Sequence, residues 1–269
     1  MFRRNKSQAD DIDAGPAGPA ADIDEPGDDE LEDDDELEDD DELEDDDELE
    51  DSDELEDDAP VDEWEELDAS RDWRDDGPFD IGEVDLSGDA ESGIERLDFG
   101  SLIVTPDPEV AIQLQIEQQS QRVQALLALH GSSGLEVALF AAPARSSMLP
   151  EVREALQSGA TQSGGNVNLA EGPFGTELRR LVPVQGPEGE EMLHASRIWL
   201  VQGPRWLLRG TLMGESAMSD DNTGSAGVLI EFFKNLVVSR DDQPRVPGDL
   251  VWLSVPDNIG LADPPTTDA

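Results

Sequence analysis

The sequence predicts an α+β fold: an antiparallel β-sheet of about 7–9 strands with two main helices packed on it, preceded by a long disordered acidic N-terminal arm. Three observations favour this class. Most of the extreme negative charge lies in the first part of the chain. The remainder alternates short apolar runs of strand length with turn residues. Two further stretches space their apolar side chains as a helix does.

The acidic arm is defined by its charge and by a repeat. Residues 1–98 hold 46 of the 67 acidic side chains and 6 of the 17 basic ones, and residues 29–58 repeat the motif DELEDD with one serine as the only change. The leucines of the repeat are six residues apart, so they form no helical stripe. We therefore expect a disordered arm over residues 1–89, a single α+β domain over residues 90–256 and a flexible tail over residues 257–269.

Three roles for the arm stay open. The simplest is a solubilising spacer, because like charges keep such a chain extended. The second is a lure for a basic partner or a mimic of nucleic-acid charge. The third is weak binding of divalent cations, although the sequence contains no EF-hand calcium loop.

One segment inside the arm differs from the repeat. Pro60 can open a helix on which Val61, Trp64 and Leu67 fall near one face, surrounded by acidic side chains. Such a pattern is typical of a docking motif that folds when it binds a partner. The alternative is that Trp64 and Trp73 pack back onto the chain's own domain.

The first half of the domain predicts four strands and a helix. A short strand ends at Pro106, and residues 110–118 alternate apolar and polar side chains as a half-buried strand does. Residues 121–131 and 134–143 are apolar runs around a glycine turn, which predicts a hairpin. A helix is expected near Leu149–Gln157, with a proline tolerated in its first turn.

The second half predicts a second hairpin and the stronger of the two helices. In chain order we expect weak strands at 166–173 and 176–184, hairpin strands at 196–201 and 205–213, a helix at 228–239 and a last strand at 249–256. The helix is indicated by an apolar stripe made of Leu229, Phe232, Phe233, Leu236 and Val237.

Composition disfavours several classes of protein. Cysteine is absent, which excludes disulfides, thiol nucleophiles and thiolate metal sites. The first residues lack the apolar core of a secretory signal, and no run of 18 apolar residues occurs, so we expect a cytoplasmic protein without a membrane span. The net charge of −50 disfavours direct nucleic-acid binding.

No catalytic constellation stands out. The two histidines, His130 and His194, have no nucleophile elbow near them, and the domain's single lysine, Lys234, belongs to no phosphate-binding loop. No sequence motif indicates that two carboxylates come together as an acid and base pair. We therefore expect no enzyme activity, no cofactor and no metal site.

The one polar feature above this background is a run of arginines. Two of them, Arg205 and Arg209, are expected on one face of a strand opposite the apolar Trp206, which would let them hold one anionic group. The alternatives are a solvated face or ion pairs with Glu177 and Glu215. The candidate anion or partner site comprises Arg145, Arg179, Arg197, Arg205 and Arg209, with Arg180 beside them.

The pieces LFAAPARS, EGPFGTELR, QGPRWLLRG and PGDLVWLSVP resemble an actinobacterial family known as Domain-of-Unknown-Function family 3710, over roughly residues 90–256. The resemblance implies a cytoplasmic actinobacterial protein and supplies no catalytic residues. We expect a non-enzymatic protein-interaction or regulatory module with an unknown protein partner, whose acidic arm solubilises it or tunes binding, with a basic partner for the arm. The alternative is a small-molecule or phosphate-ester binding protein or enzyme that uses the arginine face.

Overall fold

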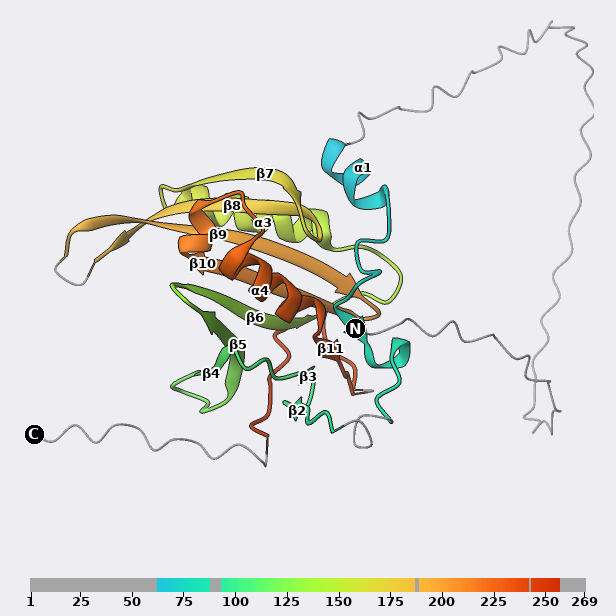
Figure 1. The fold of residues 1–269 in the computed structure, drawn as a ribbon. Helices are drawn as coiled ribbons and strands as arrows, with labels where there is room; N and C mark the ends of the chain where they lie inside the picture. Colours follow the sequence, from blue (N-terminus) through green and yellow to red (C-terminus); the bar gives the residue numbers. More distant parts are fainter. Residues whose placement is uncertain (1–61, 88–92, 187–188, 242, 257–269) are drawn as a thin grey trace, which may run out of the picture. The chain divides into compact units, whose positions relative to one another are not determined.

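A seven-stranded antiparallel sheet dominates the computed structural model, which describes residues 62–87, 93–186, 189–241 and 243–256 (Figure 1). The strand order is β4-β5-β6-β10-β9-β8-β7, and each neighbouring pair is antiparallel. The bounds are β4 (Ala111–Ile116), β5 (Val123–His130), β6 (Ser133–Ala141), β7 (Asn166–Gly172), β8 (Gly175–Gln185), β9 (Glu191–Gly203) and β10 (Trp206–Gly214). The α+β class and both predicted hairpins are confirmed.

One main helix covers each face of this sheet (Figure 1). On one face lies α4 (Gly224–Lys234), whose Phe233 ring contacts Trp199 of β9 with centroids 5.6 Å apart. On the other face lies α3 (Leu149–Gln162), which is longer than predicted and packs its apolar side chains near Leu178 and Leu200. Each face of the sheet therefore packs through an apolar layer against one helix.

The alternation predicted for β10 is confirmed. Trp206, Leu208 and Leu212 belong to the core under α4, whereas Leu207 belongs to the core under α3. Trp206 is fully buried, and its indole N–H donates to the Asp80 carboxylate at 2.8 Å. The strand is thus fixed by burial on both faces.

Two expectations at the C-terminal side were wrong. The predicted helix 228–239 ends at Lys234, and Val237–Val238 instead form strand β11, which pairs with β1 and β3 in a small second sheet. The segment 249–256 is not a continuous strand, because its pairing is limited to single bridges at Leu250 and Leu253. The second sheet has the order β1-β11-β3-β2, with β1 (Phe79–Asp80), β2 (Leu97–Asp98) and β3 (Leu102–Val104).

The segment before the expected domain boundary is part of the fold. We call residues 62–80 the N-terminal strap; it contains α1 (Glu63–Ala69) and ends in β1. Phe79 is buried, and Arg74 forms two hydrogen bonds with Glu83 of the short helix η1 (Ile81–Glu83), at 3.0 and 2.9 Å. The folded unit therefore extends N-terminally of the expected boundary at residue 90. The DELEDD repeat and the tail 257–269 lie outside the described residues.

Candidate functional site

Strands β8 and β9 extend beyond the rest of the sheet (Figure 1). The pairing of β7 with β8 stops at Asn166 opposite Leu181, and the pairing of β10 with β9 stops at Met213 opposite Ser196. Beyond these positions the two strands pair only with each other. We call this two-stranded extension, together with Leu181 at its base, the β8–β9 finger; it comprises residues 181–185 and 191–195.

The finger exposes large apolar side chains. Leu193 is 71% exposed, Met192 48%, Leu181 46% and Val184 39%. The side chains of Leu181 and Leu193 lie on the α4 side of the ribbon, and those of Val184 and Met192 lie on the α3 side, because successive residues of a strand alternate. Apolar side chains are therefore exposed on both faces.

The finger also has two open edges. The ribbon is paired along its middle only, so the outer backbone groups of Val182–Gln185 have no neighbouring strand, and the same holds for Glu191–Ala195. Glu190 and Glu191 are exposed beside its tip. This surface was not predicted, although the sequence carries a signal for it: residues 181–184 and 192–193 are apolar at successive positions, unlike a strand with one solvated face.

The predicted arginine cluster is divided among four places, of which the loop of Arg145 is the most distant in sequence. Arg179 and Arg197 lie on the α4 face of the sheet, Arg180 and Arg209 lie on the α3 face, and Arg205 lies in the turn before β10 with a φ of 61°. Neighbours such as Arg179 and Arg180 point to opposite faces because they are consecutive in a strand. The chain therefore does not assemble one arginine face.

On the α4 face, Arg197 and Glu177 form a buried ion pair. Glu177 is 0% exposed and Arg197 1%. The guanidinium donates to both carboxylate oxygens at 2.9 and 2.8 Å, and Trp199 Nε1 donates to the same carboxylate at 2.7 Å. Arg179 adds a fourth donor at 3.0 Å. The expected pairing of an arginine with Glu177 is thus present.

The same cluster fixes the loop that leads into α4. Arg197 donates to the Ser219 carbonyl at 3.1 Å and to Asn222 Oδ1 at 2.7 Å, and Arg179 pairs with Asp220. This loop connects η2 (Glu215–Met218) to the helix. Because its donors and acceptors are used within the protein, the cluster supports the fold.

On the α3 face, Arg180 and Arg209 lie near Glu136. Arg209 Nη2 contacts Glu136 Oε1 at 3.4 Å, and Arg180 Nε donates to Ser196 Oγ at 3.1 Å. Burial lowers the pKa of Arg180, and the positive charge of Arg209 lowers it further, because the two guanidinium groups repel each other. Two pairs of the predicted arginines therefore stay close together, Arg179 with Arg197 on the α4 face and Arg180 with Arg209 on the α3 face.

The other two candidate arginines lie elsewhere. Arg145 is exposed in the loop between β6 and α3. The Arg205 carbonyl accepts from the Ala142 N–H at 3.1 Å and from Arg240. Burial and the nearby charges of Arg245 and Arg205 lower the pKa of Arg240. Arg205 is exposed, and its backbone carbonyl joins the turn before β10 to Ala142 and to Arg240 of the C-terminal segment.

The candidate docking motif lies on the strap. Trp64 and Leu67 are half-buried on α1, and Val61 lies outside the described residues. Trp73 packs against Gly175, and its indole N–H donates to the Leu67 carbonyl at 3.0 Å. In this structure the segment packs back onto its own domain, as the second alternative expected.

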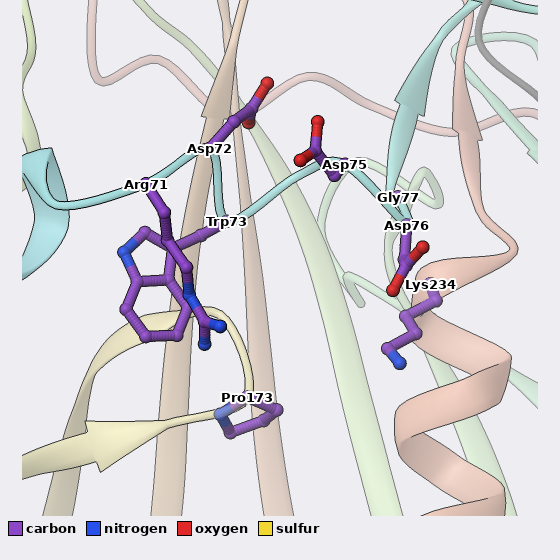
Figure 2. Close-up of a pocket in the computed structure, with 8 residues that line it drawn as sticks. All are labelled: Arg71, Asp72, Trp73, Asp75, Asp76, Gly77, Pro173 and Lys234. Carbon is purple, nitrogen blue, oxygen red and sulfur yellow. The ribbon is translucent and has the colours of Figure 1, made fainter.

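A cavity of about 360 Å³ lies between the strap and the end of α4 (Figure 2). Lys234 enters it from α4, and its Nζ donates to Glu231 at 3.0 Å. The guanidinium of Arg71 lies 3.6 Å from the centre of the Trp73 ring. Both cations of the cavity thus have protein partners. Its lining consists of Arg71, Asp72, Trp73, Asp75, Asp76, Gly77, Pro173 and Lys234.

The described ranges contain no group of three or more metal-ligating side chains. The Nδ1 atom of His130 lies 2.9 Å from Ser225 Oγ at the start of α4, and His194 is half-buried in the finger. None of the helices in the described ranges has both the length and the apolar character that a membrane crossing requires.

The fold defines an α+β protein with a helix on each face of an antiparallel sheet. The chain belongs to the family described as "Protein of unknown function (DUF3710)", which matches residues 77–261. Comparison with curated proteins gives no match. Among solved structures the chain is similar to the solution structure of cyanobacterial PsbP (CyanoP) from Synechocystis sp. PCC 6803, with 7% identity and a TM-score of 0.33, over 54% of this chain and 92% of that one.

Proposed function

We propose that this protein is a non-enzymatic protein-interaction module and that the β8–β9 finger is its docking element. The observation that carries the proposal is the exposure of Leu193, Met192 and Leu181 on a ribbon that leaves the sheet. A partner that covers this apolar patch would be bound favourably, because moving apolar surface out of water is stabilising.

The backbone of the finger supports the same function. A two-stranded ribbon without further neighbours has marginal stability in water. Its outer edge along Glu191–Ala195 offers unpaired N–H and C=O groups, whereas Pro183 on the other edge has no N–H to donate. A partner strand could pack on the apolar side chains and, at the same time, form hydrogen bonds with the free backbone groups of one edge. The finger therefore fits a protein partner better than a small ligand, for which it offers no enclosed pocket.

The charge of the finger restricts the partner. Glu190 and Glu191 are exposed beside the apolar side chains, and the chain carries a net charge of −50. Like charge opposes a second copy of the chain and an anionic lipid surface. The complementary partner is a protein with an apolar groove bordered by lysine or arginine side chains.

The acidic arm and the location of the protein belong to the same proposal. The arm keeps the chain dispersed or tunes the affinity of the finger through charge repulsion, and a basic partner is the one it would favour. A cytoplasmic location agrees with a chain that contains no cysteine.

Site-specific photo-crosslinking tests the docking element. A photoreactive side chain replaces Leu193 in the full chain, which is then expressed in cells of the source organism. The matched control carries the same group at Val246, which is 67% exposed and lies outside the finger. We expect a defined protein adduct from position 193 and none of the same mass from position 246.

The adduct is then examined with purified components. The captured protein should bind the wild-type chain and lose at least about tenfold in affinity when Met192→Ser and Leu193→Ser are combined, because buried apolar anchors dominate interface energy. Val246→Ser should leave the affinity unchanged. Adducts that link only two copies of the chain, or equal adducts from both positions, would overturn the proposal.

A further inference from the structure

The α1 part of the strap is held on the domain chiefly through one carboxylate. Asp68 Oδ1 accepts hydrogen bonds from the Thr176 N–H and the Thr176 hydroxyl, both at 2.8 Å, and Asp68 Oδ2 pairs with Arg153 of α3. Arg153 is only 4% exposed. A cation, a backbone N–H and a hydroxyl thus converge on a single carboxylate, which is the arrangement of a carboxylate-binding site.

The receiving surface is shaped for a close approach. The pairing of β8 with β9 begins at Leu178 opposite Ile198, so Thr176 lies just before that ladder and Asp68 supplies its acceptor. Gly175 has a φ of +93°, and a Cβ at this position would lie 2.7 Å from Asp68 Oδ1. Only glycine leaves room for the carboxylate at this turn.

The occupant fits this surface loosely. Helix α1 has seven residues and no buried side chain, so neither its length nor its apolar contacts hold it in place. A cavity of about 330 Å³ remains beside Asp68 and Arg153, in addition to the cavity of about 360 Å³ in Figure 2. A segment with few apolar contacts and space around it can open at low cost.

We propose that Arg153 and Thr176 form a recognition site for an acidic peptide segment, which the strap occupies through Asp68 and which an acidic segment of a partner protein can take in exchange. The ligand is an aspartate or glutamate side chain followed by an aromatic residue that seats on Gly175, as Trp73 does. The site is separate from the β8–β9 finger and goes beyond the proposed docking function.

The overall charge makes this site easy to test. An acidic peptide is repelled by a chain of net charge −50, so binding requires a specific site. The probe is a fluorescent synthetic peptide with the sequence of residues 62–76, titrated with the full-length protein and followed by fluorescence anisotropy. The wild-type protein should bind it weakly because its own strap competes at high effective concentration.

Asp68→Asn weakens the internal competitor and should raise the affinity for the peptide by at least about tenfold. Adding Arg153→Gln to that variant should abolish the gain, and a peptide in which Asp68 is replaced by asparagine should not bind. Circular dichroism melts check that each variant is folded. Trp73→Ala loosens the strap at a different contact, so it serves as the second variant if Asp68→Asn does not fold, with the same expected gain.

Three results would overturn the inference: equal affinities for wild-type and loosened proteins, a gain that persists after Arg153→Gln, or binding of the asparagine peptide. A defect confined to the finger variants Met192→Ser and Leu193→Ser leaves this site unaffected. Failure of the docking function and failure of the carboxylate site are therefore distinguishable.

Discussion

Arg197 donates to both carboxylate oxygens of Glu177, at 2.9 and 2.8 Å, and both side chains are excluded from solvent. An ion pair so deeply buried gains little net free energy over apolar residues, but removing one partner leaves an uncompensated charge. The pair also fixes the loop before α4 through Asn222. Its integrity therefore contributes to holding the loop that leads into α4.

The first prediction concerns this pair. Glu177→Gln should lower the free energy of unfolding by about 3–5 kcal/mol, because Arg197 stays buried without its counter-charge. Urea denaturation monitored by tryptophan fluorescence measures the change. Glu191→Gln is the control, since Glu191 is exposed, and it should change stability by less than about 0.5 kcal/mol. Equal small effects at both positions would show that the pair does not stabilise the loop.

The second prediction concerns Trp206. Trp206→Ala should cost about 3–5 kcal/mol, because it leaves a large cavity in the core under α4. Trp206→Phe keeps most of the apolar contact and loses the 2.8 Å hydrogen bond to Asp80, so it should cost about 1–3 kcal/mol. Thermal or urea unfolding separates the two. A loss below about 1 kcal/mol for the alanine variant would contradict the core assignment.

The third prediction concerns acid pH. The side-chain hydrogen bond from Thr223, followed by its backbone N–H, lowers the pKa of Asp221. A lowered folded-state pKa contributes stability that is present above the unfolded pKa and is lost as the pH falls through the folded one. Thr223→Val should raise the pKa of Asp221 towards its usual range, and Thr223→Ser should not. Carbon-detected NMR titration of the Asp221 carboxyl checks this; identical curves for wild type and the valine variant would disprove it.

The fourth prediction separates stability from docking. Leu193→Ser should change the free energy of unfolding by less than about 0.5 kcal/mol, because the side chain is mostly exposed. The same substitution at the buried Leu200 on the same strand should cost several times more. Calorimetric melts of the two variants provide the comparison. Similar losses at both positions would mean that the finger packs on the domain.

Much of the sheet was predictable from local pattern. The alternation in residues 110–118 and the apolar runs on both sides of Gly131 and Gly203 predicted strands that the structure contains, since period and turn residues are properties of the sequence alone. Val237 was predicted to continue the helical stripe and instead pairs with Ile103. Val237 lies in a strand and not in the helix because it pairs with β3, which is far away in the sequence.

The candidate site was less predictable. The split of Arg179 from Arg180 follows from strand alternation, but their partners Asp220 and Ser196 depend on the register of neighbouring strands. The exposure of Leu193 depends on where β7 and β10 stop, and the consecutive apolar residues of the finger do not specify those positions. The strap was assigned to the arm, with packing onto the domain only as an alternative, because Asp68 binds residues more than 80 positions away.

The most direct test of the docking finger uses the protein's five methionines, of which Met192 lies in the finger and Met218 is 75% exposed outside it. The full chain with carbon-13-labelled methionine methyl groups is titrated with cell extract from the source organism and followed by NMR. We predict that the Met192 signal broadens or shifts first, while the Met218 signal stays sharp. A sharp Met192 signal, or uniform broadening of both, would contradict the central claim that the β8–β9 finger is the surface through which this protein binds its partner.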